Sequence, residues 1–478
     1  MSTESVVPKE PTEPAGKGFD RILGSRETLA VAFGAMIGFG WIVLTGGFLA
    51  DAGTLGAALA FVIGGFVVLL VGLTYAELVS AMPDAGGEHN YALRALGSRA
   101  SFVTSWSLVL GYVSVVAFEA VALPQSLLYL FPDMLVGNMW TVAGYDVYAS
   151  WVAVGVVSAV VITAINYIGI RPAAIFQSIA VLFLLAVGAA LLLGSFAGGS
   201  VEQMDPLFTG GVSGVLAVLV VTPFLFVGFD VIPQSAEELK VPSNKIGRLL
   251  IVSVVMAIAW YVLIMLTVGA SLPAEELAAS DLAAADGMSA LWGSDTMGTV
   301  LVLGGLAGIL TSWNGFLIGA SRLVYAMGHS GMLPAWFGHI HPRFRTPGNA
   351  VLFIGALSIV APFFGRETLV WLVDAGGLTI VIAYAMVALS FVVLRIREPG
   401  MERPFRTPLG LGVGILAMGL SVAIGALYLP GMTAALVWPY EWAIFGVWWL
   451  IGLVFFFKVR PVGPGPDAGK LLLVSRSR

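Results

Sequence analysis

Two short segments of the sequence combine helix-breaking residues with groups that could bind a ligand. The segment 34–41 reads Gly-Ala-Met-Ile-Gly-Phe-Gly-Trp, with three glycines in seven residues. The segment 222–230 contains Pro223 and Gly228 within a long apolar run. Proline removes a backbone donor and clashes with the preceding turn, and glycine lowers the resistance of a helix to unwinding. We therefore predict that each segment interrupts a helix.

A helix interrupted within hydrocarbon exposes backbone groups that a ligand or an ion must satisfy. The N–H groups around Ile37–Gly40 suit a carboxylate, and the carbonyl groups near Phe226–Phe229 suit an ammonium group. Such a pair would recognise an α-amino acid. The candidate substrate-binding residues lie at the two breaks or are expected to face them: Ala35, Met36, Ile37, Gly38, Phe39, Gly40, Trp41, Glu119, Phe226, Val227, Gly228, Phe229, Asp230 and Trp313.

Glu119 is an acidic residue inside an apolar run, 116–121, with no basic residue near it. An ionisable group at the centre of a membrane helix costs at least about 2.5 kcal/mol, so we expect it to face a cavity or a partner. Three roles stay open: proton carrier, ligand for a substrate cation, or structural hydrogen-bonding acid. Asp230 has two interpretations, a substrate contact or a cap on the following half-helix, whose dipole an acid complements.

Several aromatic residues could surround a substrate ammonium group through cation–π contacts. Aromatic residues are plentiful in this chain, so packing is the alternative interpretation for each of them. The five candidates are Trp41, Phe224, Phe226, Phe229 and Trp313.

The elements that position these residues are long apolar helices. Of the 478 residues, 58% are hydrophobic and 11% are charged, whereas a soluble protein carries about 25% charged residues. Apolar runs long enough to cross a bilayer recur along the chain. The predicted helices are 29–50, 54–81, 102–131, 150–170, 174–194, 211–236, 247–271, 297–327, 348–364, 368–394, 408–430 and 437–458. This pattern predicts an all-α integral membrane protein with about twelve transmembrane helices.

The distribution of basic residues predicts how these helices are oriented. With a cytoplasmic N-terminus, every lysine and arginine except Arg366 falls in a cytoplasmic segment. Basic residues favour the cytoplasmic side of a membrane. We therefore expect a multi-pass protein of the inner or plasma membrane with both termini in the cytoplasm.

The two predicted breaks also suggest an internal repeat. Gly228 lies 190 positions after Gly38, and later helices follow at a similar offset. Five helices per repeat, an odd number, would place the second copy inverted in the membrane, as in many transporters. The predicted organisation is a cytoplasmic tail (1–28), a first repeat (29–194), a second repeat (211–394), two further helices (408–458) and a second cytoplasmic tail (459–478).

Several motifs together resemble those of the amino acid–polyamine–organocation transporter superfamily. They occur in the family order and span most of the chain: Gly34–Trp41, Met82–Tyr91, Gly228–Pro242, Ser321–Gly328, Gly331–Pro334, His341–Pro347 and Arg403–Pro408. The resemblance implies a LeuT-type 5+5 inverted repeat with two additional helices. It also implies alternating access and substrates that are amino acids, polyamines or related organic cations.

The resemblance also bears on the coupling ion, for which Na⁺ and H⁺ both stay open, as does exchange. In LeuT-type folds a hydroxyl pair such as Thr311 and Ser312 can hold Na⁺ together with carbonyls from Ala35–Gly38. The alternative is that the two hydroxyls donate hydrogen bonds to carbonyls of their own helix. Some proton-coupled relatives carry a lysine in helix five, which here has no basic residue between 173 and 194. Glu119 remains a candidate proton site. Trp41 replaces a small aliphatic residue of the family motif; if it lines the site, it should restrict the volume and favour a small substrate.

Other function classes find little support in the sequence. The absence of cysteine excludes a disulfide-linked subunit, and no basic patch suggests nucleic acid binding. The four histidines are scattered in predicted cytoplasmic loops and predict no metal site. No catalytic motif lies within the spans, and we expect no cofactor beyond a coupling ion. The partners expected are the lipid bilayer and an amino acid, with a small amine or polyamine as the alternative substrate. A transport-defective nutrient sensor is the alternative of another class, and both a monomer and a homodimer stay open.

Overall fold

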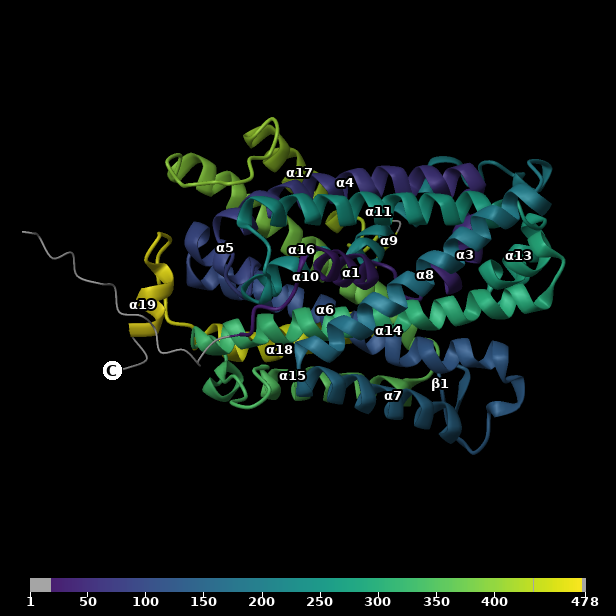
Figure 1. The fold of residues 1–478 in the computed structure, drawn as a ribbon, viewed down its shortest axis with the longest axis horizontal. Helices are drawn as coiled ribbons and strands as arrows, with labels where there is room; N and C mark the ends of the chain where they lie inside the picture. The colour runs from purple at the N-terminus through teal and green to yellow at the C-terminus, as the bar shows by residue number, and fades with distance from the viewer. Residues whose placement is uncertain (1–18, 433, 475–478) are drawn as a thin grey trace, which may run out of the picture.

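The computed structural model describes residues 19–432 and 434–474, and its long helices run side by side along one axis (Figure 1). The helices of this bundle are α1 (Ser25–Met36), α2 (Gly40–Val43), α3 (Thr45–Ala52), α4 (Thr54–Ala81), α6 (Ser98–Leu130), α7 (Ala149–Ile168), α8 (Ile170–Gly198), α9 (Gly211–Phe226), α10 (Val231–Gln234), α11 (Ser243–Gly269), α14 (Asp295–His329), α15 (Gly348–Val360), α16 (Thr368–Arg397), α17 (Leu411–Ala426) and α18 (Tyr440–Phe456).

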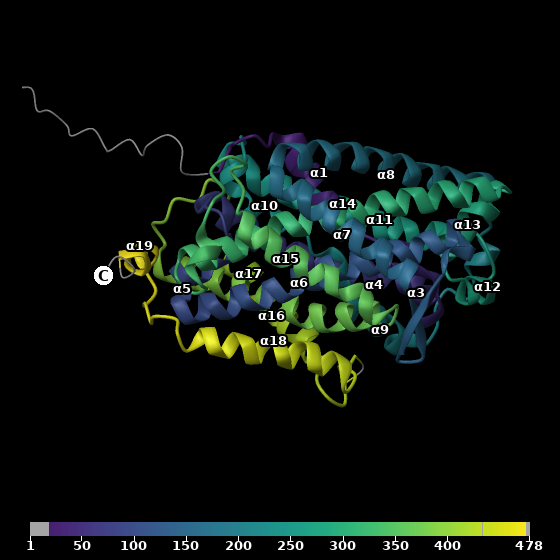
Figure 2. The same cartoon turned by 90° about the horizontal axis from the view of Figure 1, so that it is seen from below.

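Shorter elements mark the two ends of the bundle. At one end lie α5 (Glu88–Leu96) and α19 (Ala468–Val474), and we call this the basic end because most lysines and arginines lie there. At the other end lie α12 (Ala274–Ala279), α13 (Ala283–Trp292) and a hairpin of β1 (Asn138–Val142) and β2 (Tyr145–Tyr148); we call it the hairpin end (Figure 2).

The predicted fold class is confirmed. Within the described residues, nine helical spans are long and apolar enough to cross a membrane, and three shorter apolar helices complete the twelve. The shorter helices are Gly348–Phe364, Leu411–Ala426 and Tyr440–Phe456. Several helices extend a few residues past the predicted bounds because polar residues outside the apolar runs continue the helical turns; α8, for example, covers 170–198 instead of 174–194.

The β-hairpin is an element that the sequence analysis did not predict. Its strands are antiparallel, with Val142 opposite Tyr145, and the turn residues Ala143 and Gly144 both have positive φ. Two-residue turns with positive φ match the twist of antiparallel strands. The turn therefore sets the pairing, and hydropathy could not reveal it because most of the strand residues are exposed.

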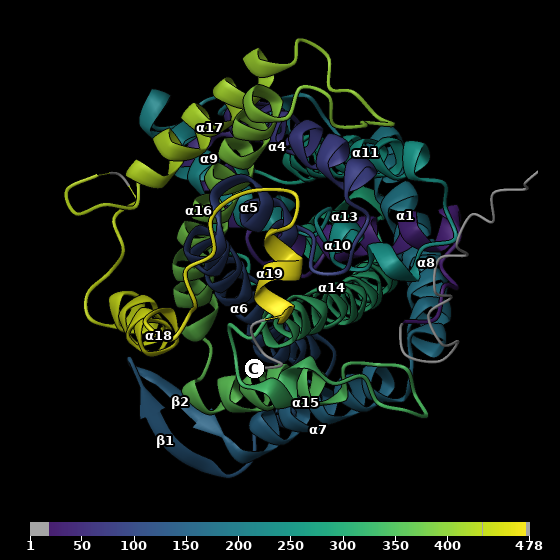
Figure 3. The ribbon, with the colours of Figure 1, turned by 90° about the vertical axis from the view of Figure 1, so that its left-hand side faces the viewer.

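Both predicted helix breaks are present. The first falls between α1 and α2 at residues 37–39, and the second between α9 and α10 at residues 227–230. Seen along the bundle axis, α10 lies near the centre, whereas α17 and α18 lie at the periphery (Figure 3). The inverted relation between the two halves stays a prediction.

The predicted cytoplasmic segments differ in part from simple tails and loops. Residues 1–18 lie outside the described residues, but Ile22 and Leu23 donate backbone hydrogen bonds to Glu238 O, at 2.9 and 3.0 Å. The predicted C-terminal tail includes α19. His89, expected in a loop, is buried in α5, where its Nδ1 lies 3.1 Å from the Ser101 hydroxyl, because α5 folds back against α6.

Buried ion pairs hold the helices together at the basic end. Arg322 of α14 pairs with Glu238, which follows α10, at 2.8 Å, and both side chains are 1% exposed. Glu77 of α4 pairs with Arg395 and with Arg403, the latter at 3.0 Å, and accepts the Thr407 N–H at 2.7 Å. Glu77 therefore joins α4 to α16 and to the segment that follows α16.

Removing the Glu77 carboxylate should destabilise this end of the bundle. Breaking a buried ion pair by removing one partner costs roughly 3–5 kcal/mol, because the remaining charge is left uncompensated. We expect Glu77→Ala to lower the melting temperature of the purified protein, whereas Glu402→Ala, at a neighbouring exposed position, should not. Equal melting temperatures for the two variants would contradict this account.

Candidate substrate site at the two helix breaks

A small cavity lies at the break of the first helix. Its volume is about 20 Å³, which is room for about one water molecule. The residues that line it come from both broken helices and from α6, α11 and α14: Ala35, Met36, Gly38, Phe39, Gly40, Val115, Phe118, Glu119, Phe224, Leu225, Tyr261, Ser312 and Phe316. A substrate larger than water can therefore enter only if these helices separate.

The Glu119 carboxylate lies over the unwound segment of the first helix. It lies close to the Phe39 N–H and to the Ser312 hydroxyl. A Cβ atom on Gly38 would clash with Glu119 Oε1 and would lie 2.8 Å from Ser312 Oγ. Glycine at position 38 is thus what allows the carboxylate to approach the backbone. Glu119 therefore lies beside the N–H groups that were predicted to bind a substrate carboxylate.

The second carboxylate oxygen of Glu119 is buried and has no hydrogen-bond partner among the described residues. A buried acidic oxygen without a partner is unfavourable. This oxygen therefore needs a proton, a water molecule or a ligand.

Tyr261 of α11 satisfies carbonyl groups at both breaks. Its hydroxyl lies 3.0 Å from Met36 O, at the end of α1, and 3.3 Å from Leu225 O, near the end of α9. The last carbonyls of a helix lack intrahelical partners, so one phenol supports two helix ends. The sequence analysis missed Tyr261; the only signal was a single phenol inside an apolar helix.

The two broken helices also touch directly. Gly228 has φ +131°, and a Cβ atom there would lie 2.8 Å from Met36 N and 2.9 Å from the Ala35 carbonyl carbon. Asp230 Oδ1 accepts the Gly228 N–H at 2.9 Å. Asp230 therefore contacts the unwound segment, and its side chain makes no capping hydrogen bond to α10.

The proposed Na⁺ ligands point in different directions. The Thr311 hydroxyl lies 3.1 Å from Gly34 O and 2.9 Å from Gly308 O, whereas Ser312 faces Glu119. Beside them, Gln177 of α8 donates to Thr311 O at 3.0 Å. Gln177 was also missed in the sequence, where it is a single amide in an apolar helix.

A chain of amides extends from Gln177 across the bundle. Asn314 of α14 donates to Gln177 Oε1 at 2.8 Å, and Asn166 of α7 donates to Asn314 Oδ1 at 2.8 Å. All three side chains are buried. These hydrogen bonds connect α7, α14 and α8 next to the end of α1.

The structure brings together only part of the predicted site. Six of the candidate substrate-binding residues line the cavity: Ala35, Met36, Gly38, Phe39, Gly40 and Glu119. The other candidates, together with Thr311, are buried outside it: Ile37, Trp41, Phe226, Val227, Gly228, Phe229, Asp230 and Trp313. Trp41, for example, packs edge-on against Trp260 with ring centroids 5.3 Å apart. Of the aromatic candidates, Phe224 lines the cavity.

In the part of the chain that the structure describes, twelve apolar helices, two of them interrupted beside a buried carboxylate, define a multi-pass membrane transporter. The sequence profile of the amino acid permease family matches residues 23–462, and the chain belongs to that family. It is 27% identical to the methylthioribose transporter of Bacillus subtilis over 95% of this chain and 97% of the relative. It is also 27% identical to the branched-chain amino acid permease BcaP of the same organism, over 92% and 93%.

A plant relative is similar over a shorter region. The vacuolar cationic amino acid transporter 4 of Arabidopsis thaliana is 26% identical over 79% of this chain and 64% of its own length. These relatives, all named as transporters or permeases, indicate that the protein is a transporter and not an enzyme.

Adding one methyl group at Gly38 should disable the site. Gly38→Ala would push the Glu119 carboxylate away from the Phe39 N–H. A loss of about 1.4 kcal/mol of binding free energy corresponds to a tenfold loss of affinity. We expect substrate exchange across proteoliposomes to fall tenfold or more. Gly47→Ala, where nothing lies within 4 Å of the new methyl group, is the matched control and should exchange normally. Normal exchange by both variants would contradict the proposed role of Gly38.

Proposed function

We propose that this protein is a secondary transporter that moves a small amino acid across the cell membrane by alternating access, with Glu119 as its proton site. One observation carries the proposal: a buried carboxylate lies beside the backbone N–H groups at the break of the first helix. Those N–H groups are also the best donors for the carboxylate of an amino acid. Family membership and the amino acid permeases among the relatives support the substrate class.

Competition for the same donors would couple the substrate to a proton. A substrate carboxylate that binds near Phe39 comes close to Glu119, and two carboxylates at one site cannot both stay ionised without a large cost. Substrate binding therefore favours a proton on Glu119. When the site opens to the other side and the substrate leaves, Glu119 can release that proton and return to the Phe39 N–H. This cycle is symport of an amino acid with H⁺.

The contacts around Thr311 support H⁺ over Na⁺. The Thr311 hydroxyl donates within the protein, and Gln177 directs N–H donors, not oxygen ligands, toward the backbone of α1 and α14. Sodium requires several oxygen ligands directed at one point. We expect replacement of Na⁺ by choline to leave uptake unchanged; uptake that needs Na⁺ would overturn H⁺ coupling.

The distribution of charge supports the proposed orientation. Apart from Arg366, the lysines and arginines of the described residues belong to segments at the basic end. We propose that this end faces the cytoplasm and that both termini lie there. The hairpin end would then face outward.

A carrier of small amines is the second candidate function. The unpartnered Glu119 oxygen lies in a cavity that Phe118, Phe224 and Phe316 also line. A carboxylate beside aromatic faces suits an ammonium group. In that case Glu119 would bind the substrate itself instead of a proton.

Counterflow in proteoliposomes distinguishes these proposals without knowledge of the coupling ion. Vesicles preloaded with unlabelled compound are offered labelled leucine, arginine, methylthioribose or isopentylamine, the amine formed by decarboxylating leucine. Exchange of an amino acid but not of the amine would support the main proposal. Exchange of the amine alone would favour the second candidate. No exchange of any amino acid or amine would overturn both, and is the result expected of a transport-defective sensor.

Glu119→Gln should separate exchange from accumulation. Glutamine keeps the shape of a protonated glutamate but cannot release a proton. We expect counterflow of the amino acid to continue, and accumulation driven by an inward proton gradient to fall to the equilibrium level. Glu402→Gln, at an exposed position, serves as the control. Accumulation by Glu119→Gln that still follows the proton gradient would show that the proton binds elsewhere.

A further inference from the structure

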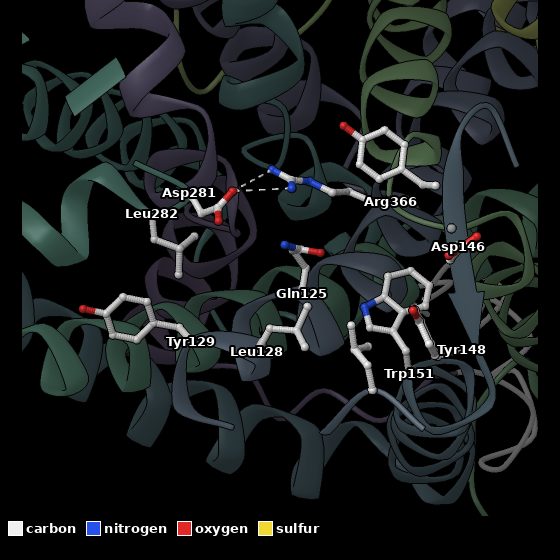
Figure 4. Close-up of a pocket in the computed structure, with 12 residues that line it drawn as sticks. Gln125, Leu128, Tyr129, Asp146, Tyr148, Trp151, Asp281, Leu282 and Arg366 are labelled. Carbon is white, nitrogen blue, oxygen red and sulfur yellow. Dashed lines mark hydrogen bonds and ion pairs between the residues drawn. The ribbon is translucent and has the colours of Figure 1, made fainter. Parts of the chain in front are cut away.

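A second cavity, of about 300 Å³, lies at the hairpin end (Figure 4). It is many times larger than the cavity at the helix break. Three regions of the chain that are distant in sequence line it: the stretch from the end of α6 through the β-hairpin to the start of α7, the segment before α13, and the loop before α16. The lining residues that matter here are Gln125, Leu135, Asp146, Trp151, Asp281 and Arg366.

Arg366 is the unusual residue of this cavity. Among the described residues it is the one basic side chain outside the basic end, and it pairs with Asp281 at 3.5 Å. The pair is exposed, with 37% of the Arg366 side chain and 82% of the Asp281 side chain accessible. An exposed ion pair contributes about 0–1 kcal/mol, so a ligand can replace it at little cost. The stabilisation from this ion pair therefore does not by itself explain why position 366 is an arginine.

The cavity offers both charges and an apolar wall to a single small ligand. Figure 4 shows the Arg366 guanidinium and the Asp281 carboxylate facing each other, with the Gln125 amide close by. Asp146, Tyr148 and Trp151 lie together on the other side of the cavity. A guanidinium binds a carboxylate through two parallel hydrogen bonds. The Asp281 carboxylate can accept hydrogen bonds from an ammonium group.

The cavity lies above the central site on the same helix. Gln125 follows Glu119 by six residues on α6, a separation of about 9 Å along the helix axis. A ligand held here would lie between the surface of the hairpin end and the break of the first helix.

We infer that this cavity is a second binding site, specific for zwitterionic α-amino acids. Arg366 binds the carboxylate, Asp281 binds the ammonium group, and Trp151 and the leucines contact the side chain. The site concentrates the amino acid above the sealed central cavity before the helices separate. This inference rests on the proposed function for the identity of the ligand, but it requires a separate site.

A single introduced cysteine can report on this cavity, because the chain contains no cysteine. Leu135 lines the cavity and is 37% exposed, so Leu135→Cys should react with a membrane-impermeant maleimide. Leucine is the probe. At ten times its half-protecting concentration, we expect leucine to slow the reaction about tenfold, as one-site occupancy requires. Val201→Cys, exposed on a loop after α8, should react at the same rate with and without leucine.

The charge requirement distinguishes this site from the central one. In the Leu135→Cys background, Arg366→Gln should abolish protection by leucine, whereas the charge-matched Arg343→Gln, exposed at the basic end, should retain it. Isopentylamine and 4-methylpentanoate each lack one charged group of leucine, and neither should protect at the same concentration. Melting temperatures of the variants check that each remains folded.

Two results would overturn the inference. Equal protection with and without Arg366 would place the leucine effect at another site. No protection of Leu135→Cys at leucine concentrations that saturate counterflow would show that the cavity does not bind the amino acid, while leaving the transport proposal intact. Failure of counterflow itself would instead refute the proposed function.

Discussion

The structure depends on one constraint: backbone groups exposed by an interrupted helix must find partners inside the protein, because hydrocarbon offers none. At the first break, Glu119 lies beside the Phe39 N–H, and Tyr261 donates toward the carbonyl of Met36. At the second break, Asp230 accepts the Gly228 N–H. Each break is therefore stabilised by a side chain that carries a proton or a charge.

This arrangement explains why the central cavity is small. Protein side chains already fill the positions that the substrate groups would take, with a carboxylate at the N–H groups and a phenol at the carbonyls. Substrate binding then means replacing internal hydrogen bonds with equivalent ones from the ligand. An exchange of this kind changes the total number of hydrogen bonds little, so small differences in charge can decide which helix arrangement is favoured.

The amides and ion pairs around the site limit how the helices can move. Gln177, Asn314 and Asn166 connect α8, α14 and α7 through buried hydrogen bonds. The buried Arg322–Glu238 pair joins α14 to the segment after α10 at the basic end. At the hairpin end, the Arg366–Asp281 pair is instead exposed. In this structure the protein is therefore held more tightly at its basic end than at its hairpin end.

The sequence by itself determined the helix class, the two breaks and the isolated position of Glu119, because these follow from hydropathy, from the backbone properties of glycine and proline, and from the cost of burying a charge. It could not determine which residues meet, since contacts such as those of Tyr261 and Gln177 join helices far apart in the chain. Gly228 and Trp41 illustrate the limit: both lie close to the site in sequence, but packing places them outside the cavity. Only the tertiary structure brought Asp281 and Arg366 together at one cavity, because their loops are adjacent in space and not in sequence.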